Sequence, residues 1–214
     1  MNAQLSRWAP LSGIAFVVLL IVGLVLIADI PDADAPDQEI ADYLADSSVH
    51  VRNIIGLYLW TLAGVSFLWF VAHLRGVLRQ AEGEAGTLSG LAFGAGVVFA
   101  ALLMASAAAI AAVAGAIELG NATEPAPDFV RMMPQLGYAT LLFGGAFAAI
   151  VLIVSTSIVA LQTGALPRWL IWLGFAAALV LLLAFAFLPM IALPIWVLAV
   201  AVVLLRRPAE QAAT

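Results

Sequence analysis

Cysteine and lysine are absent from this chain of 214 residues, and only 10% of its residues are charged. Without cysteine the chain has no disulfide, no thiol nucleophile, no thiolate metal site and no palmitoylation site. Its formal net charge of −5 argues against a nucleic-acid-binding protein, because such proteins present basic surfaces to phosphate groups. A soluble domain carries about 25% charged residues, so lipid is the expected solvent for most of this chain.

Histidine is also scarce, and its placement argues against a cofactor. His50 and His73 lie near opposite ends of the second predicted span, and 23 residues of helix separate them by about 34 Å. They therefore cannot share a metal ion or a haem within one chain, and we predict neither a metal site nor a cofactor. A pairing of His50 with Met132 or Met133 is the one arrangement that depth in the membrane leaves open.

Groups that carry chemistry are missing from the apolar runs. No acidic or basic residue falls within the core of any predicted span, which disfavours a proton-coupled pump or an ion channel. The sequence holds no HExxH, GxSxG or P-loop motif. We therefore predict that the protein is not an enzyme. A membrane enzyme, the weakest hypothesis, would depend on carboxylates of the outer loops.

What the sequence does contain is long hydrophobic runs, and hydrophobic residues make up 65% of it. About 20 apolar residues in a helix cross the hydrocarbon layer of a membrane. The predicted fold class is therefore all-α, a polytopic transmembrane helical bundle that forms one domain over residues 1–214. Its six spans are predicted at about residues 11–28, 54–74, 88–117, 136–161, 169–187 and 191–205.

The last two spans come from one uncharged run, Trp169 to Leu205, whose 37 residues would form a helix about 55 Å long. That is too long for one crossing, and Pro189 and Pro194 disfavour a continuous helix. We expect a tight hairpin that turns around residues 188–194. Two alternatives stay open, namely five spans with a kinked or re-entrant last run, and a cleaved signal peptide over the first 35 residues.

The arginines predict the orientation. Cytoplasmic loops carry an excess of basic residues. In the six-span scheme, six of the eight arginines fall on one side, and only Arg52 and Arg131 fall on the other. We therefore predict a multi-pass protein of the plasma membrane with both termini in the cytoplasm. The six are Arg7, Arg75, Arg79, Arg168, Arg206 and Arg207.

The first outer loop, residues 29–53, is the largest polar segment. Asp37 is placed to cap a short juxtamembrane helix in which Ile40, Tyr43 and Leu44 form one apolar stripe. We expect this helix to lie across the outer mouth of the bundle or on the bilayer surface, as a lid or as a ligand or partner site. The aspartates of this loop do not follow EF-hand spacing, which leaves only loose cation binding. The second outer loop carries a glycosylation sequon at Asn121.

Small residues predict how the helices pack. Gly86, Gly90 and Gly94 are spaced four apart at the start of the third span, and Gly144 and Gly145 lie in the fourth. Such spacing forms a groove that lets another helix approach closely. We expect these glycines to pack the third span against the fourth, with homo-oligomerisation or a ligand-filled crevice as alternatives. Arg75 and Arg79 share a helix face at the inner leaflet, where they can contact anionic lipid headgroups.

Four short segments carry a family resemblance. They are Arg7-Trp8, residues 39–44 (EIADYL), residues 74–79 (LRGVLR) followed by Glu82-Gly83, and residues 166–170 (LPRWL). With these segments the chain resembles a group of uncharacterised six-span integral membrane proteins of actinobacteria. The resemblance implies a membrane protein without an assigned reaction, and it transfers no functional residue.

Two functional hypotheses follow from these observations. The first is a non-enzymatic structural or accessory subunit whose small-residue helix faces pack with a second copy or with a larger membrane complex. The alternative is a carrier or binder of a lipid or another apolar small molecule. It rests on the aromatic residues of the second span (Tyr58, Trp60, Phe67, Trp69 and Phe70), which would face the small-residue helices. Membrane lipids are expected partners in both cases.

Overall fold

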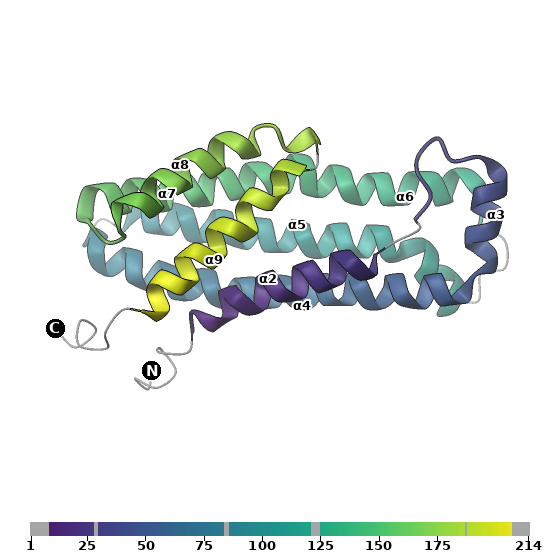
Figure 1. The fold of residues 1–214 in the computed structure, drawn as a ribbon, viewed down its shortest axis with the longest axis horizontal. Helices are drawn as coiled ribbons and strands as arrows, with labels where there is room; N and C mark the ends of the chain where they lie inside the picture. The colour runs from purple at the N-terminus through teal and green to yellow at the C-terminus, as the bar shows by residue number, and fades with distance from the viewer. Residues whose placement is uncertain (1–8, 28–29, 84–85, 121–124, 187, 207–214) are drawn as a thin grey trace.

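A computed structural model describes residues 9–27, 30–83, 86–120, 125–186 and 188–206, and every regular element in these ranges is helical. Figure 1 shows an elongated bundle with one short helix across one end. The α-helices are α2 (Leu11–Leu26), α3 (Asp37–Ala45), α4 (Ser47–Glu82), α5 (Thr87–Glu118), α6 (Pro127–Ala139), α7 (Ala146–Thr163), α8 (Arg168–Leu181) and α9 (Ala192–Leu205). A π-helix, η1 (Thr140–Gly145), joins α6 to α7, and 3₁₀ turns η2 (Ala184–Ala186) and η3 (Leu188–Ile191) join α8 to α9.

The predicted all-α bundle is confirmed, and its apolar helices differ in length. Four of the described helical segments are long and apolar enough to cross a membrane: Ser47–Glu82, Thr87–Glu118, Pro127–Thr163 and Leu188–Leu205. The first and fifth predicted spans correspond to shorter apolar helices, α2 and α8. Membrane location is therefore supported by length and composition, most strongly for α4, α5 and the continuous α6–α7 rod.

The long helices extend well past the predicted spans. α4 begins at Ser47, where Asp46 caps its first turn, and it ends at Glu82, before Gly83 with its positive φ; no proline interrupts the helix. The connection between the third and fourth predicted spans is partly helical. Helix α6 begins at Pro127, where proline is tolerated in the first turn, and it continues through Pro134.

The α8–α9 hairpin turns earlier and deeper than expected. α8 ends at Leu181, and Pro194 lies in the first turn of α9 rather than in the connection. Figure 1 places this connection partway along the bundle, well short of the end where α3 lies. Leu182, Leu183 and Leu188 of this connection are exposed, whereas Ala184 is buried. Exposed leucines at this depth fit contact with lipid.

Two apolar cores hold the molecule together. The larger core runs through the bundle, where Phe16, Phe67 and Phe99 form a cluster of rings with centroids 4.8 to 6.3 Å apart. The smaller core lies at the α3 end, where Ile40 and Tyr43 of α3 meet Val113 of α5 and Val130 of α6. The expected juxtamembrane helix is therefore present, and its predicted apolar stripe faces the bundle.

Candidate functional site

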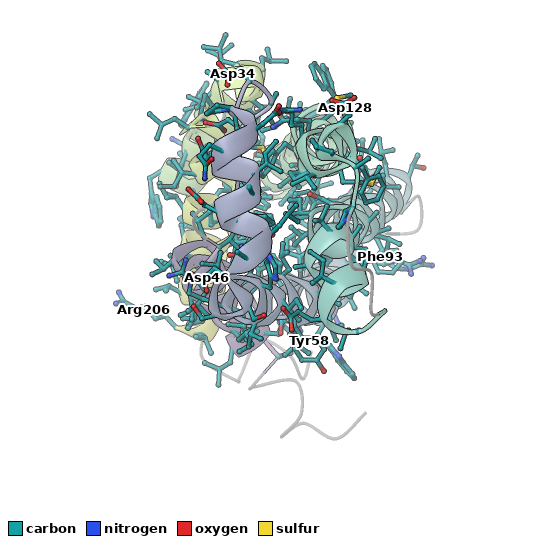
Figure 2. All side chains as sticks on the ribbon, turned by 90° about the vertical axis from the view of Figure 1, so that its right-hand side faces the viewer. Asp34, Asp46, Tyr58, Phe93, Asp128 and Arg206 are labelled. Carbon is teal, nitrogen blue, oxygen red and sulfur yellow. The ribbon has the colours of Figure 1, made fainter. Side chains whose placement is uncertain are left out.

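The α3 end carries the densest group of polar contacts among the described residues. Figure 2 looks along the bundle from this end and shows α3 crossing in front of the other helices, with Asp34 near one of its ends and Asp46 near the other. The first residue of α3, Asp37, is not its cap, because Pro36 occupies that position. Asp37 instead contacts the guanidinium group of Arg131 on α6.

Arg131 fastens the start of α3 to α6. Its Nε and Nη2 atoms both donate to the carbonyl oxygen of Ala35, at 3.1 and 3.0 Å, and Nη2 also reaches Oδ1 of Asp37. Asp128, one turn earlier on α6, accepts a longer bond from Nη1 at 3.3 Å. One arginine, placed by the sequence on the outer side, therefore joins two segments 96 residues apart.

His50 lies beneath α3 and is completely buried, with 0% of its side chain exposed. Its Nδ1 atom lies 2.9 Å from Oε1 of Glu118, the last residue of α5. A carboxylate only accepts hydrogen bonds, so Nδ1 carries a proton, and when the ring is neutral Nε2 is an acceptor. Nε2 is buried and has no hydrogen-bond partner among the described residues.

The surroundings of His50 are partly polar. The ring of Tyr43 meets the imidazole edge-on, with centroids 4.8 Å apart. Burial raises the pKa of the Tyr43 hydroxyl, and a hydrogen bond with the side chain of Asn53 offsets part of that rise. Ser47 forms a side-chain hydrogen bond with Glu118. We call these five residues, Tyr43, Ser47, His50, Asn53 and Glu118, the His50 cluster.

Sequence reasoning did not anticipate this cluster. It considered Met132 and Met133 as partners of His50 but not Glu118, which lies 68 residues away in the chain. The sequence feature that could have linked His50 to Glu118 is their position, since both lie just outside predicted spans on the same side of the membrane. Of the two methionines considered as partners of His50, Met132 is exposed, whereas Met133 packs against the smaller core.

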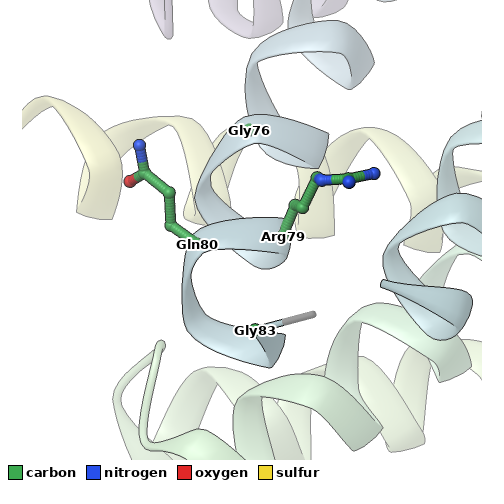
Figure 3. Close-up of a pocket in the computed structure, with 4 residues that line it drawn as sticks. All are labelled: Gly76, Arg79, Gln80 and Gly83. Carbon is green, nitrogen blue, oxygen red and sulfur yellow. The ribbon is translucent and has the colours of Figure 1, made fainter. Parts of the chain in front are cut away.

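The opposite end of the bundle carries the predicted lipid-contacting arginines. The guanidinium carbon of Arg75 lies 4.8 Å from the ring centroid of Phe93 on α5, a cation–π contact. Arg79, Gly76, Gln80 and Gly83 line an open groove of about 560 Å³ (Figure 3). Arg79 therefore lies beside an accessible surface, and the contact of both arginines with lipid headgroups stays a prediction.

The three glycines at the start of α5 do not act as predicted. Gly86 has a φ of 54° and forms the left-handed N-cap of α5, a conformation that side chains disfavour. At Gly90 or Gly94, an added Cβ would meet no described atom within 4 Å. The expectation that Gly90 and Gly94 pack α5 against α7 is therefore wrong within one chain, because they lie on a different face of α5.

The other predicted packing glycines, Gly144 and Gly145, lie in η1. A Cβ at Gly144 would meet Leu102 of α5 at 2.9 Å, and one at Gly145 would meet Phe99 at 3.8 Å but Leu141 of its own segment at 3.0 Å. Gly144 is therefore the position at which the predicted packing of these two spans has a close interhelical contact.

Closer approaches occur at Gly23 and Gly137, which the sequence analysis did not single out, and at Gly96, which continues the predicted small-residue run of the third span. A Cβ at Gly23 would lie 2.7 Å from the Gly56 carbonyl oxygen, and one at Gly137 would lie 2.8 Å from the Ser106 carbonyl oxygen. A Cβ at Gly96 would lie 2.5 Å from Val71. Gly23 and Gly137 are single glycines on different helices, so a search for four-residue spacing within one helix does not find them.

The aromatic residues of α4 divide into two groups. Trp60, Phe67 and Phe70 are buried, and the Trp60 indole donates to the Leu20 carbonyl oxygen at 3.1 Å. Tyr58 and Trp69 are exposed. The buried rings thus pack against α2 and α5, where the carrier hypothesis would place a ligand.

Parts of several predictions lie outside the described residues. These are Arg7 and Trp8 before α2, Arg207 after α9, and the Asn121 sequon. The described arginines do group as predicted, because Arg75, Arg79, Arg168 and Arg206 belong to the end of the bundle opposite α3. Comparison of the chain with protein-family models, curated proteins and solved structures finds no match.

Proposed function

We propose that this chain is a six-helix integral protein of the plasma membrane with a structural or accessory role rather than a catalytic one. Six membrane-embedded helices account for the four long apolar segments together with the shorter helices α2 and α8. The α8–α9 hairpin enters and leaves on one side. Both termini then lie on the same side as Arg75, Arg79, Arg168 and Arg206, which the positive-inside rule assigns to the cytoplasm.

The observation that carries the association role is an uncovered face of α5. Gly90, Gly94, Ala101, Ala105 and Ala108 lie along one side of this helix, and we call them the open α5 face. Gly90 is half-buried and the other four are exposed. The five positions span about 27 Å of helix, close to the thickness of the hydrocarbon layer.

A surface of small residues favours a helix partner over lipid alone. Beside small residues two helix backbones approach closely and gain van der Waals contacts. Val97, 37% exposed, is the larger side chain on this side of α5, between Gly94 and Ala101. A second copy of this chain or a subunit of a larger complex would provide such a helix. The carrier alternative needs free space beside the α4 rings, and Phe16 and Phe99 already pack there.

Cysteine cross-linking in native membranes tests this role, because the native chain contributes no thiol. Gly94→Cys and Ala101→Cys are expected to form oxidative cross-links to a second copy or to another subunit. Trp172→Cys on α8, where the native side chain is 66% exposed, is the matched control and should not. Native mass spectra should show the corresponding complex, and Gly94→Leu should weaken it.

A monomer that carries only lipid, with no cross-link from either α5 position, would reject the association role. Equal cross-linking from α5 and from α8 would also reject it, because random collision in the membrane gives that result.

A further inference from the structure

The buried imidazole of His50 is the polar group that the proposed association role leaves unexplained. One of its nitrogens is held by Glu118 at 2.9 Å, and the other, Nε2, faces buried surroundings without a hydrogen-bond partner among the described residues. Buried polar atoms in proteins nearly always have a partner, so such an atom calls for an explanation.

We propose that the α3 end of the bundle is a pH-sensitive latch, in which protonation of His50 Nε2 releases α3 from the ends of α4, α5 and α6. In the neutral ring Nε2 is a bare acceptor, and its burial is tolerated. Protonation turns it into a charged N–H donor at the same buried position. That donor has no described acceptor, so it must reach water.

Displacing α3 is the movement that lets Nε2 reach water while it keeps the other hydrogen bond. His50 and Glu118 belong to α4 and α5, which pack along their whole length, so their contact does not depend on α3. Tyr43, whose ring covers the imidazole edge, belongs to α3. The charged ring is therefore best accommodated with Glu118 still bound and Tyr43 moved away, which shifts the population toward the open state.

The ionisable groups at the His50 end of the bundle come from α3, α4, α5 and α6. From α5 His50 faces the Glu118 carboxylate, and from α3 it faces Tyr43, a phenol whose pKa burial raises. Asp46, at the start of α4, has a lowered pKa, chiefly because the Ser48 side chain hydrogen-bonds to it. From α6 comes Arg131, always charged and bound to Asp37. Arg52 adds a charged group on α4 itself, and the Asn53 amide beside it does not ionise.

Few contacts hold α3, so a modest change suffices to open it. The helix has nine residues, and it buries Ile40 and Tyr43 against the smaller core. Its described polar attachments to the bundle are the Arg131 bonds to Ala35 and Asp37 and the side-chain hydrogen bond between Tyr43 and Asn53 of α4, which opening must break. Asp46 and α4 tether its other end, which lets α3 swing without leaving.

Labelling of single cysteines measures the latch directly. Ile40→Cys replaces a side chain that is 1% exposed and faces the core, whereas Gln38→Cys lies on the exposed side of the same helix. The ratio of their labelling rates with an impermeant maleimide cancels the intrinsic effect of pH on thiols. We expect this ratio to rise at least tenfold when the pH falls from 7.5 to 5.5.

The two histidines provide the matched control. His50→Gln should abolish the pH dependence of the ratio, and His73→Gln, at the opposite end, should leave it intact. Arg131→Gln should raise labelling of position 40 at both pH values, because it frees α3 without altering His50.

A ratio that does not change with pH overturns the latch, as does a pH dependence that survives His50→Gln or disappears in His73→Gln. If His50→Gln does not fold, Glu118→Gln replaces it. That change keeps an acceptor for Nδ1 and removes the charge that favours the imidazolium ion, so the midpoint of opening should move to lower pH. An unchanged midpoint would reject the proposal.

Discussion

Single glycines decide where the helices of this protein touch. At Gly23 an added Cβ would lie 2.6 Å from Cδ1 of Trp60 and 2.7 Å from the Gly56 carbonyl oxygen. Neither neighbour can move freely, because one atom is backbone and the Trp60 ring is held by its bond to Leu20. The distance from a glycine to atoms of the neighbouring helix, rather than the number of glycines in a helix, therefore determines how much that position matters for helix packing.

Gly23→Ala should therefore destabilise the protein by about 1–3 kcal/mol, the usual cost of overpacking. Gly94→Ala is the matched control, since no described atom lies within 4 Å of its added Cβ. Thermal unfolding of the monomer in mild detergent compares the two variants. Equal melting temperatures would contradict the close approach of α2 and α4.

A second residue-scale effect concerns the capping of α4 by Asp46. Its Oδ1 atom accepts from the backbone N–H groups of Ser48 and Val49, at 2.9 and 3.3 Å, and from the Ser48 hydroxyl at 2.6 Å. These bonds favour the ionised carboxylate and lower its pKa, the Ser48 side chain contributing most. The stabilisation is therefore present above the ordinary aspartate pKa of about 3.9. It is lost as the pH falls through the lower pKa of the folded state.

We expect Asp46→Ala to lower the melting temperature at pH 7 and to differ less from the wild type at pH 2.5, below the ordinary aspartate pKa, where the charged cap contributes less to stability. Asp46→Asn, which keeps an acceptor oxygen, should resemble the wild type at pH 7. Melting curves at the two pH values provide the measurement. An equal difference in melting temperature between Asp46→Ala and the wild type at both pH values would mean that the ionised carboxylate does not stabilise this end of α4.

At the scale of elements, the α6–η1–α7 rod is distinguished by its π-helical segment. Six residues, Thr140–Gly145, adopt this form between two stretches of α-helix that both pack on α5. A π-helical turn holds one residue more than an α-helical turn, so it keeps both stretches facing the same neighbour despite the extra residue. Val130 and Gly137 before it, and Leu152 after it, are all buried.

Deletion of Phe143, whose side chain is 62% exposed, should therefore be tolerated. Without Phe143 the segment can form a regular α-helix, and the residues before and after it still face α5. Deletion of Val151, exposed but within regular α-helix, should rotate everything before it by about 100° and unfold the rod. Size-exclusion profiles and melting in detergent separate the two cases. Similar behaviour of both deletions would argue against an inserted residue in η1.

At the scale of the whole molecule, the two ends of the bundle differ in both charge and structure. The α3 end holds the His50 cluster and most of the described acids, and the other end holds Arg75, Arg79, Arg168 and Arg206. The exposed leucines of the α8–α9 connection lie between these ends, at a depth that lipid would cover.

The proposed orientation predicts that, in intact cells, an impermeant maleimide labels Gln38→Cys strongly and Gly83→Cys not at all. Both positions are exposed, so a difference between them reports sidedness rather than burial. Disrupting the membrane should make position 83 reactive, which confirms that its thiol is intact. The reverse pattern would place both termini outside.

The helical class and the approximate position of each apolar segment followed from the sequence alone, because hydropathy is a local property that sums along a run of residues. The juxtamembrane helix was equally local, since its apolar stripe of Ile40, Tyr43 and Leu44 has helical spacing. The residues at which the helices begin and end were harder to predict from the sequence. Nothing in the polar residues before Ile54 or after Leu74 stops a helix, so α4 runs on beyond its hydrophobic stretch.

Only the tertiary structure decided which helix faces meet. Helices that are apolar on nearly every side carry no stripe that specifies their rotation, so the sequence did not reveal that Gly90 and Gly94 lie open while Gly23 and Gly137 are closely packed. The pairing of His50 with Glu118 likewise depends on the antiparallel register of α4 and α5. That register is set by side-chain packing along the interface, which no local pattern encodes.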